Sequence, residues 1–285
     1  MQIIQKDTKG LLCFAHQAMG TTFEIMVAGH PDAYCRKATR EAFRVLDQLE
    51  QQLSRFVPNS DISRINSSRP GEPICVGLQT LACIQDAMRL WQLSKGAFDI
   101  TICGAMDRIG IDTVQVCITR QHASIGLDLG GIGKGFALDQ MAEVLAGWGI
   151  HTALLHSGAS TAIALDGQWL ISLTCPFKAR QLGSIHLNRA AVSCSSQVAR
   201  PHVIDPATGT YANKTSTAWV LADTATMADA LSTAVLVCGP DKTDWLSDVG
   251  VSAFLVARHQ DHCQGMAVGP WPGLVTAWCN CPGFD

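Results

Sequence analysis

The sequence predicts a mixed α/β (α+β) fold, a single compact domain in which central sheets are flanked by helices. Segments with the period of a β-strand alternate with segments of helical period. In the middle of the chain a strand, a glycine-rich turn and a helix follow one another directly. No repeat, low-complexity run or linker divides the 285 residues, and 47% of them are hydrophobic. We therefore expect one continuous core.

The spacing of apolar residues predicts the individual elements. Alternation predicts strands over residues 21–27, 124–129, 152–155 and 168–173. Apolar positions three or four residues apart predict helices over 33–56, 79–94, 136–148 and 227–237. In the first helix the apolar stripe comprises Ala42, Leu46, Leu49 and Leu53. Clusters of Pro, Asn, Ser and Gly between these elements predict short turns.

Charge composition narrows the class of function. Charged residues make up 16% of the chain, and 21 Lys and Arg face 24 Asp and Glu. Such a chain has no basic field for a polyanion, which argues against nucleic-acid binding. We find no signal peptide and no apolar run long enough to cross a membrane. Because unpaired thiols favour a reducing compartment, we expect a cytoplasmic location, or a periplasmic one if a leader has been removed.

The 12 cysteines include no Cys-x-x-Cys pair. Most lie in apolar runs, as Cys83 and Cys238 do, and are expected to be small core residues. The tail differs, because four of its residues could serve as zinc ligands: His262, Cys263, Cys279 and Cys281. The Cys-x-Cys spacing is tight for a tetrahedral site, so the role of this group stays open.

The glycine turn at residues 130–135 connects a predicted strand to a predicted helix. Backbone N–H groups and the positive end of a helix dipole would meet there, which suits a phosphate. The run matches neither the dinucleotide fingerprint nor the Walker A motif, because Phe136 and Gly135 occupy the deciding positions. Asp128 precedes the turn and Lys134 lies within it, so an acceptor and a cation stand on either side of the possible anion site. The alternative is a tight connection that needs small residues to pack.

Two further places carry residues suited to chemistry. Asp229 and Thr233 are four apart on a predicted helix, so they share one face and could both bind Mg²⁺ through oxygen. The alternative for this pair is an acid near the helix N-terminus and a hydroxyl bonded to the backbone. His202 stands before an Asp-Pro-x-x-Gly turn and is the best candidate for a general base, although it could merely cap a strand.

Five blocks of the sequence form a pattern when they are taken together in chain order. They are Met19-Gly20-Thr21, Gly96-Ala97-Phe98-Asp99-Ile100-Thr101, Asp128-Leu129-Gly130-Gly131-Ile132-Gly133-Lys134-Gly135, His202-Val203-Ile204-Asp205-Pro206-Ala207-Thr208-Gly209 and Ala228-Asp229-Ala230-Leu231-Ser232-Thr233. This pattern resembles the ApbE family of FAD:protein FMN transferases, and the resemblance extends from about Met19 to about Pro240.

The resemblance implies a Mg²⁺-dependent enzyme that cleaves FAD, transfers FMN to a Thr or Ser hydroxyl of a partner protein, such as a redox subunit, and releases AMP. It implies an N-terminal extension over residues 1–18 and a transferase domain over 19–285. The metal would be held by Asp229, Thr233 and the carbonyl of Gly131, and His202 would assist Asp229 in catalysis. FAD would contact Met19, Phe56, Ala97, Phe98, Asp99, Asp128, Lys134 and Ile204.

The chain also departs from the family pattern. Residues 103–110 lack the Pro and Trp that usually follow the Asp99 block, and residues 156–160 lack an acid that many members carry. These departures keep two alternatives open. One is a carrier or assembly accessory that binds FAD without transferring FMN, and the other is an FAD pyrophosphatase that yields FMN and AMP.

Overall fold

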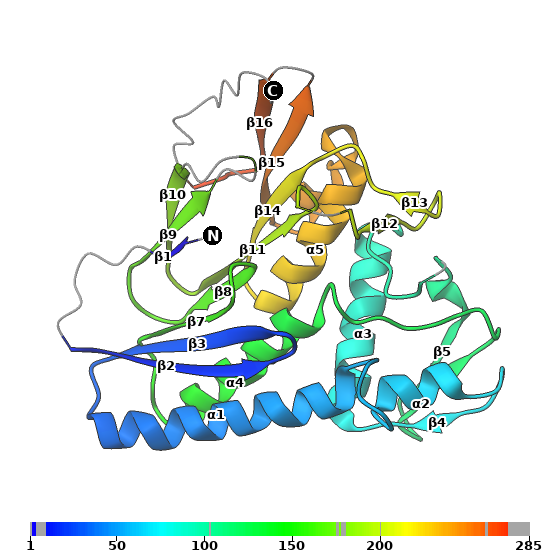
Figure 1. The fold of residues 1–285 in the computed structure, drawn as a ribbon, viewed down its shortest axis with the longest axis horizontal. Helices are drawn as coiled ribbons and strands as arrows, with labels where there is room; N and C mark the ends of the chain where they lie inside the picture. Colours follow the sequence, from blue (N-terminus) through cyan, green and yellow to red (C-terminus); the bar gives the residue numbers. More distant parts are fainter. Residues whose placement is uncertain are drawn as a thin grey trace.

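A computed structural model of the chain describes residues 2–3, 10–102, 104–174, 177, 181–199, 201–259 and 262–272, with backbone alone at 2–3, 258–259 and 262–264. The predicted mixed α/β fold is confirmed. Its centre is an eight-stranded antiparallel sheet with the strand order β16-β15-β14-β11-β8-β7-β3-β2 (Figure 1). These strands are β2 (Leu11–Ala18), β3 (Thr21–Ala28), β7 (Ala153–Ser157), β8 (Thr161–Ala164), β11 (Ala190–Ser196), β14 (Thr217–Ala222), β15 (Ser252–His259) and β16 (His262–Val268).

Smaller sheets and the helices complete the described fold. One three-stranded sheet comprises β1 (Gln2–Ile3), β9 (Trp169–Thr174) and β10 (Gln181–Leu187), and another comprises β4 (Ile74–Cys75), β6 (Cys117–Arg120) and β5 (Ile109–Asp112). A hairpin joins β12 (Ile204–Asp205) to β13 (Thr210–Tyr211). The helices are α1 (Asp32–Leu53), α2 (Asp61–Ser67), α3 (Leu78–Leu93), α4 (Gly133–Gly147), α5 (Ala225–Cys238) and α6 (Trp245–Asp248), with 3-10 turns at Met106–Arg108 and Pro240–Lys242.

The central strands bury both faces of the large sheet. In β14, Ala218 and Val220 belong to the core on the helical side, whereas Trp219 belongs to a second core. That second core also contains Trp169 and Ile171 of β9, so the small sheet covers the opposite face. Because successive side chains of a strand point to opposite faces, two cores share one sheet.

The helices form layers on one side of the sheet. Helices α4 and α5 pack against each other and against the central strands, and α1 packs against α4 and β2. Figure 1 shows α1 running below β2 and β3, with α5 beside β11 and β14. The predicted stripe of α1 is buried at Ala42, Leu46, Leu49 and Leu53, which confirms the helical spacing. No helix in the described part of the chain has the length and apolarity of a membrane span.

One predicted strand is wrong. Residues 124–129 alternate in polarity, yet only Leu127 forms a bridge, to Thr101. The reason is a side chain: Asn66 donates to the Leu127 carbonyl at 2.9 Å and accepts from its N–H at 2.7 Å. The amide thus occupies one edge of the segment, while on the other edge the backbone groups of Gly126 and Asp128 bond to only a short stretch of backbone at residues 100–102. Helix α4 also begins at Gly133, earlier than predicted.

Residues 11–18 extend the sheet. Strand β2 pairs with β3 along its whole length, from Leu11 opposite Ala28 to Ala18 opposite Thr21. The predicted boundary at residue 19 therefore falls in the hairpin turn between two paired strands, and the role of residues 1–18 as an extension stays a prediction.

The seven cysteines whose side chains the structure describes are free thiols, and several of them are buried, as expected for small core residues. Cys75 and Cys117 stand opposite each other in β4 and β6, with their sulfurs 2.8 Å apart. A hydrogen bond with Cys75 raises the pKa of Cys117 to about 11. The predicted zinc ligands Cys279 and Cys281 lie outside the described residues, as do the side chains of His262 and Cys263.

Candidate active site

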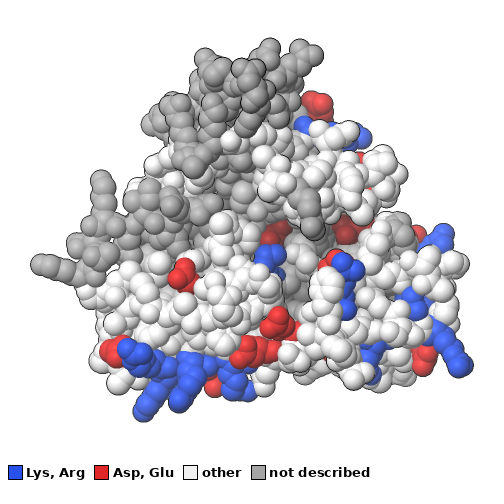
Figure 2. Space-filling model, in the orientation of Figure 1, with Lys and Arg blue, Asp and Glu red and all other residues white. Residues whose placement is uncertain are grey.

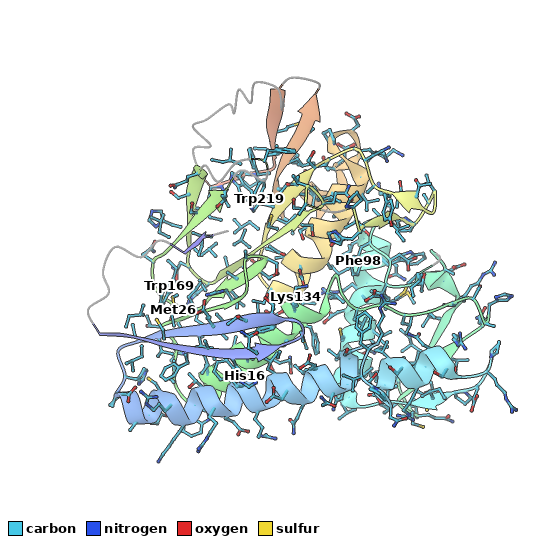
Figure 3. All side chains as sticks on the ribbon, viewed as in Figure 1. His16, Met26, Phe98, Lys134, Trp169 and Trp219 are labelled. Carbon is cyan, nitrogen blue, oxygen red and sulfur yellow. The ribbon has the colours of Figure 1, made fainter. Side chains whose placement is uncertain are left out.

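A cleft of about 950 Å³ lies between the end of the large sheet, the glycine turn and the loop before β12. Figure 3 shows Phe98 and Lys134 near one another at the middle of the molecule, where α4 begins. Figure 2 shows a hollow near the centre of this face, with acidic and basic side chains beside it. We call the wall around Asp229 and Thr233 the deep end, and the side formed by Arg55, Asp128 and Lys134 the mouth.

The deep end is built by close contact between two helices. A Cβ atom at Gly135 would lie 2.2 Å from the carbonyl oxygen of Ala225 and 2.8 Å from the Cβ of Asp229. Only glycine fits there, and its N–H donates to Asp229 Oδ2 at 3.0 Å. The other oxygen, Oδ1, accepts from the hydroxyls of Thr161 at 3.1 Å and Ser193 at 3.2 Å. The carboxylate is therefore fixed by neutral donors from α4, β8 and β11.

Most backbone N–H groups of the glycine turn form hydrogen bonds within the protein. The N–H groups of Gly130, Gly133 and Gly135 donate to Asp128, to the Leu129 carbonyl and to Asp229. The predicted phosphate cradle is thus largely replaced by the alternative, a tight connection that lets α4 pack against α5. Lys134 still lines the cleft, and its ammonium donates to the Gly130 carbonyl at 3.1 Å.

The N-terminus of α5 is anchored from α4. Asp139 accepts hydrogen bonds from the N–H groups of Ala225 and Thr226, each at 2.8 Å, while Thr224 accepts from Met227. Burial raises the pKa of Asp139, and these hydrogen bonds oppose that shift. Since Asp229 lies one turn into the same helix, the anchor fixes its position.

The deep end suits a hard divalent cation. Asp229 is only 5% exposed, and among the described residues no Lys, Arg or His forms an ion pair with it. A buried carboxylate with neutral partners alone is costly, so a bound cation would offset its charge. Gly131 lies close to Thr233. A Cβ atom on Gly131 would be 3.5 Å from the hydroxyl oxygen of Thr233.

The proposed donor set contains a single carboxylate. No group of three His, Cys, Asp or Glu side chains converges anywhere in the described ranges. Hydroxyl and backbone oxygens would therefore supply the other protein ligands, from Thr233 and Gly131. Mg²⁺ accepts such a set because it keeps several water molecules in its shell.

The mouth is held by charged side chains on the surface. Arg55 Nε lies 3.1 Å from Asp128 Oδ2, and these side chains are 37% and 40% exposed. Asp128 Oδ1 accepts from Gly130 N–H at 2.9 Å. The Arg55 guanidinium also lies over the ring of Phe56, 4.5 Å from its centroid. Sequence analysis missed Arg55, because the signals that predict helices and turns say nothing about a loop side chain reaching a distant residue.

The loop after α3 forms a further wall of the cleft. Phe98 is buried, and Asp99 Oδ1 accepts from both the N–H and the hydroxyl of Thr101, each at 2.6 Å. Burial raises the pKa of Asp99, against the opposing effect of these hydrogen bonds. Asp99 therefore organises its own loop while it faces the cleft.

The structure brings most of the predicted site residues to one cleft. Its lining includes Phe98, Asp99, Asp128, Gly131, Lys134, His202, Ile204, Asp229 and Thr233. Three predicted FAD contacts, Met19, Phe56 and Ala97, are not among the described lining residues. Phe56 is 79% exposed, and among the described residues its contact with the cleft lining is the one with Arg55. Thr161 and Ser193, which hold Asp229, were also missed, since isolated hydroxyls in strands carry no sequence signal.

Comparison with known proteins gives the same answer as the motifs. A family model described as the ApbE family matches residues 19–255. The FAD:protein FMN transferase of Vibrio cholerae is 25% identical and aligns with 79% of this chain and 80% of its own length. The FAD:protein FMN transferase of Haemophilus influenzae is 24% identical, with 84% of this chain and 83% of the relative aligned.

Solved structures show the same fold. The flavin transferase ApbE from Vibrio cholerae superposes with a TM-score of 0.83 at 22% identity, covering 90% of this chain and 96% of that one. The apo flavinyl transferase ApbE of Pseudomonas stutzeri gives 0.81 at 22% identity, covering 90% and 94%. Because the family model spans most of the sequence, the chain belongs to the ApbE family.

Proposed function

We propose that this protein transfers FMN from FAD to the hydroxyl of a Ser or Thr in a partner protein and releases AMP. Membership in the ApbE family and the names of the relatives support this activity. The observation that carries it is one cleft, large enough for a dinucleotide, that is lined both by Lys134 and by a buried Asp229 with no ion-pair partner among the described residues.

We propose Mg²⁺ as the metal, held by Asp229, Thr233 and the carbonyl of Gly131. When bound, such an ion neutralises charge on a diphosphate and polarises its phosphorus–oxygen bonds. Lys134 keeps two ammonium protons beyond its bond to Gly130, and these can bind phosphate oxygen. Lys134 and the metal site line the same cleft, so both could contact the diphosphate of FAD.

The transfer itself needs a base and an aligned hydroxyl. His202 lines the cleft, and its imidazole would accept the proton of the acceptor hydroxyl. The oxygen of that hydroxyl forms a bond to the phosphorus of the FMN half, while the bond from that phosphorus to the bridging oxygen breaks. AMP leaves with the electron pair, so no further reactant is needed.

The test incubates the protein with FAD, Mg²⁺ and a purified redox subunit that carries a candidate Ser or Thr site. We expect intact-mass spectra to show one FMN added to the acceptor and an equal amount of AMP in solution. Free FMN and AMP without modified acceptor would instead indicate a pyrophosphatase. FAD binding without AMP release would indicate a carrier, and either result would overturn the proposal.

A further inference from the structure

Arg55 occupies a defined position at the mouth of the cleft. It follows α1 in a loop that serine side chains tie down: Ser60 donates to the carbonyl of Ser54 at 2.6 Å, and Ser63 donates to the carbonyl of Arg55 at 3.1 Å. Phe56 supports the guanidinium from one side, and Asp128 binds its Nε. The side chain is therefore directed into the cleft by its own loop.

Most of the guanidinium remains available to a ligand. Arginine carries five N–H donors in a planar fork, and the Nε side of this fork forms the ion pair with Asp128. Within the described residues, the two terminal nitrogens have no hydrogen bond, although Arg55 lines the cleft. A planar fork with free terminal donors matches the oxygens of a phosphate group.

The balance of charge shows why this position matters. Among the described residues that line the cleft, one arginine and one lysine, Arg55 and Lys134, accompany three carboxylates: Asp99, Asp128 and Asp229. A diphosphate approaching the mouth meets Asp128 first, and the like charges repel each other. Arg55 cancels that repulsion through its ion pair and adds donors on the same side as Lys134. A residue that only supported the loop would not need to reach the carboxylate.

We propose that Arg55 is a binding residue for the diphosphate of FAD, in which its terminal nitrogens donate to a non-bridging phosphate oxygen while Nε stays on Asp128. This inference rests on the proposed function and adds a recognition residue to it. It assigns Arg55 to the phosphates, and the competing role, stacking on an aromatic ring of the substrate, is an outcome of the test.

The experiment compares ligands with and without phosphates. Calorimetry in the presence of Mg²⁺ measures the affinity of the full chain for FAD, ADP and adenosine. We expect Arg55→Ala to weaken ADP binding roughly tenfold and to leave adenosine binding unchanged, because one partly exposed charge-assisted contact is lost. Arg55→Lys should recover part of the loss, and added salt should reduce the difference between the variant and the wild type.

Arg64 provides the matched control. Its Nη1 lies 3.0 Å from Asp61, its side chain is 44% exposed, and it is not among the cleft residues. Arg64→Ala should therefore bind ADP as the wild type does. Equal losses for ADP and adenosine in Arg55→Ala would overturn the assignment in favour of stacking, and no loss would remove Arg55 from the site. If the wild type bound neither FAD nor ADP, the proposed function itself would fail, which is a different result.

Discussion

The deep end and the mouth of the cleft hold their acids in opposite ways. Asp229 is buried and fixed by a backbone N–H and two hydroxyls, all neutral and all from rigid elements. Asp128 is exposed and is held by an arginine that a loop supplies. A preorganised anion costs little to maintain once a cation binds it, whereas an exposed ion pair can keep its contact while the remaining donors of the arginine bind a substrate. The comparison supports the proposal that the deep end is a fixed metal site and the mouth an adaptable substrate site.

The largest expected effect comes from separating the helices of the deep end. Gly135→Ala would place a methyl group 2.2 Å from the Ala225 carbonyl oxygen, and backbone atoms cannot rotate away. We expect a loss of about 1–3 kcal/mol in the free energy of unfolding, measured by urea denaturation, together with loss of FMN transfer.

Gly147→Ala is the control within the same helix. No atom lies within 4 Å of a Cβ at Gly147, so the substitution should be neutral or stabilise the protein by about 0.4–1 kcal/mol. If Gly135→Ala unfolded at the same urea concentration as the wild type, the contact between α4 and α5 would not be the rigid support that we describe.

The second prediction removes the charge of the deep end and keeps its shape. In Asp229→Asn the amide oxygen can still accept from Gly135 N–H, and the amide nitrogen can donate to Thr161 and Ser193, whose hydroxyls rotate to accept. We expect stability close to that of the wild type and a loss of more than about a hundredfold in Mg²⁺-dependent transfer.

Titration with Mn²⁺ as a probe reports on the metal independently of turnover. The affinity for Mn²⁺ should fall in Asp229→Asn and stay unchanged in Asp86→Asn, whose carboxylate pairs with Arg89 on α3 outside the cleft. Retained Mn²⁺ binding by Asp229→Asn would show that the metal ligands lie elsewhere.

The two ends also differ in how far sequence could predict them. Asp229 and Thr233 share a helix, so their spacing of four residues already places them on one face. Arg55 and Asp128 meet only because α1 ends beside the glycine turn, and no local pattern encodes that contact. Lys134 was predicted because it lies within the glycine-rich motif. The hydroxyls of Thr161 and Ser193 were not, because they come from two different strands and meet only in the folded protein.

The fold shows a similar division. Helix α1 was predictable because one face is apolar and the other is charged. Strand β14 has no such alternation, since five of its six residues are buried between the two cores, and periodicity alone does not separate such a run from a helix. Residues 124–129 alternate as a strand would, but the side chain of Asn66 binds the backbone groups of Leu127.

The smallest expected effect is a pH dependence of stability that comes from one buried histidine. His156 lies in β7, and its Nδ1 lies 3.0 Å from the carbonyl of Gly158, in the turn that presents Ser160 to the cleft. Burial lowers the pKa of His156 from its usual 6.5, although Glu24, 2.9 Å from Nε2, opposes the shift. Below pH 6.5 the unfolded chain therefore takes up a proton that the folded chain resists, so stability is full above this pH and falls as the pH drops through it. We expect the free energy of unfolding in urea to decrease as the pH falls through this range, and His156→Gln should flatten this part of the pH profile because glutamine does not titrate.

Arg55→Ala is the control for this measurement. Arg55 forms its ion pair with Asp128 and not with a partner of His156, so Arg55→Ala should keep the wild-type slope. If instead His156→Gln kept the slope and Arg55→Ala removed it, the pH dependence would come from the exposed mouth and not from the buried histidine.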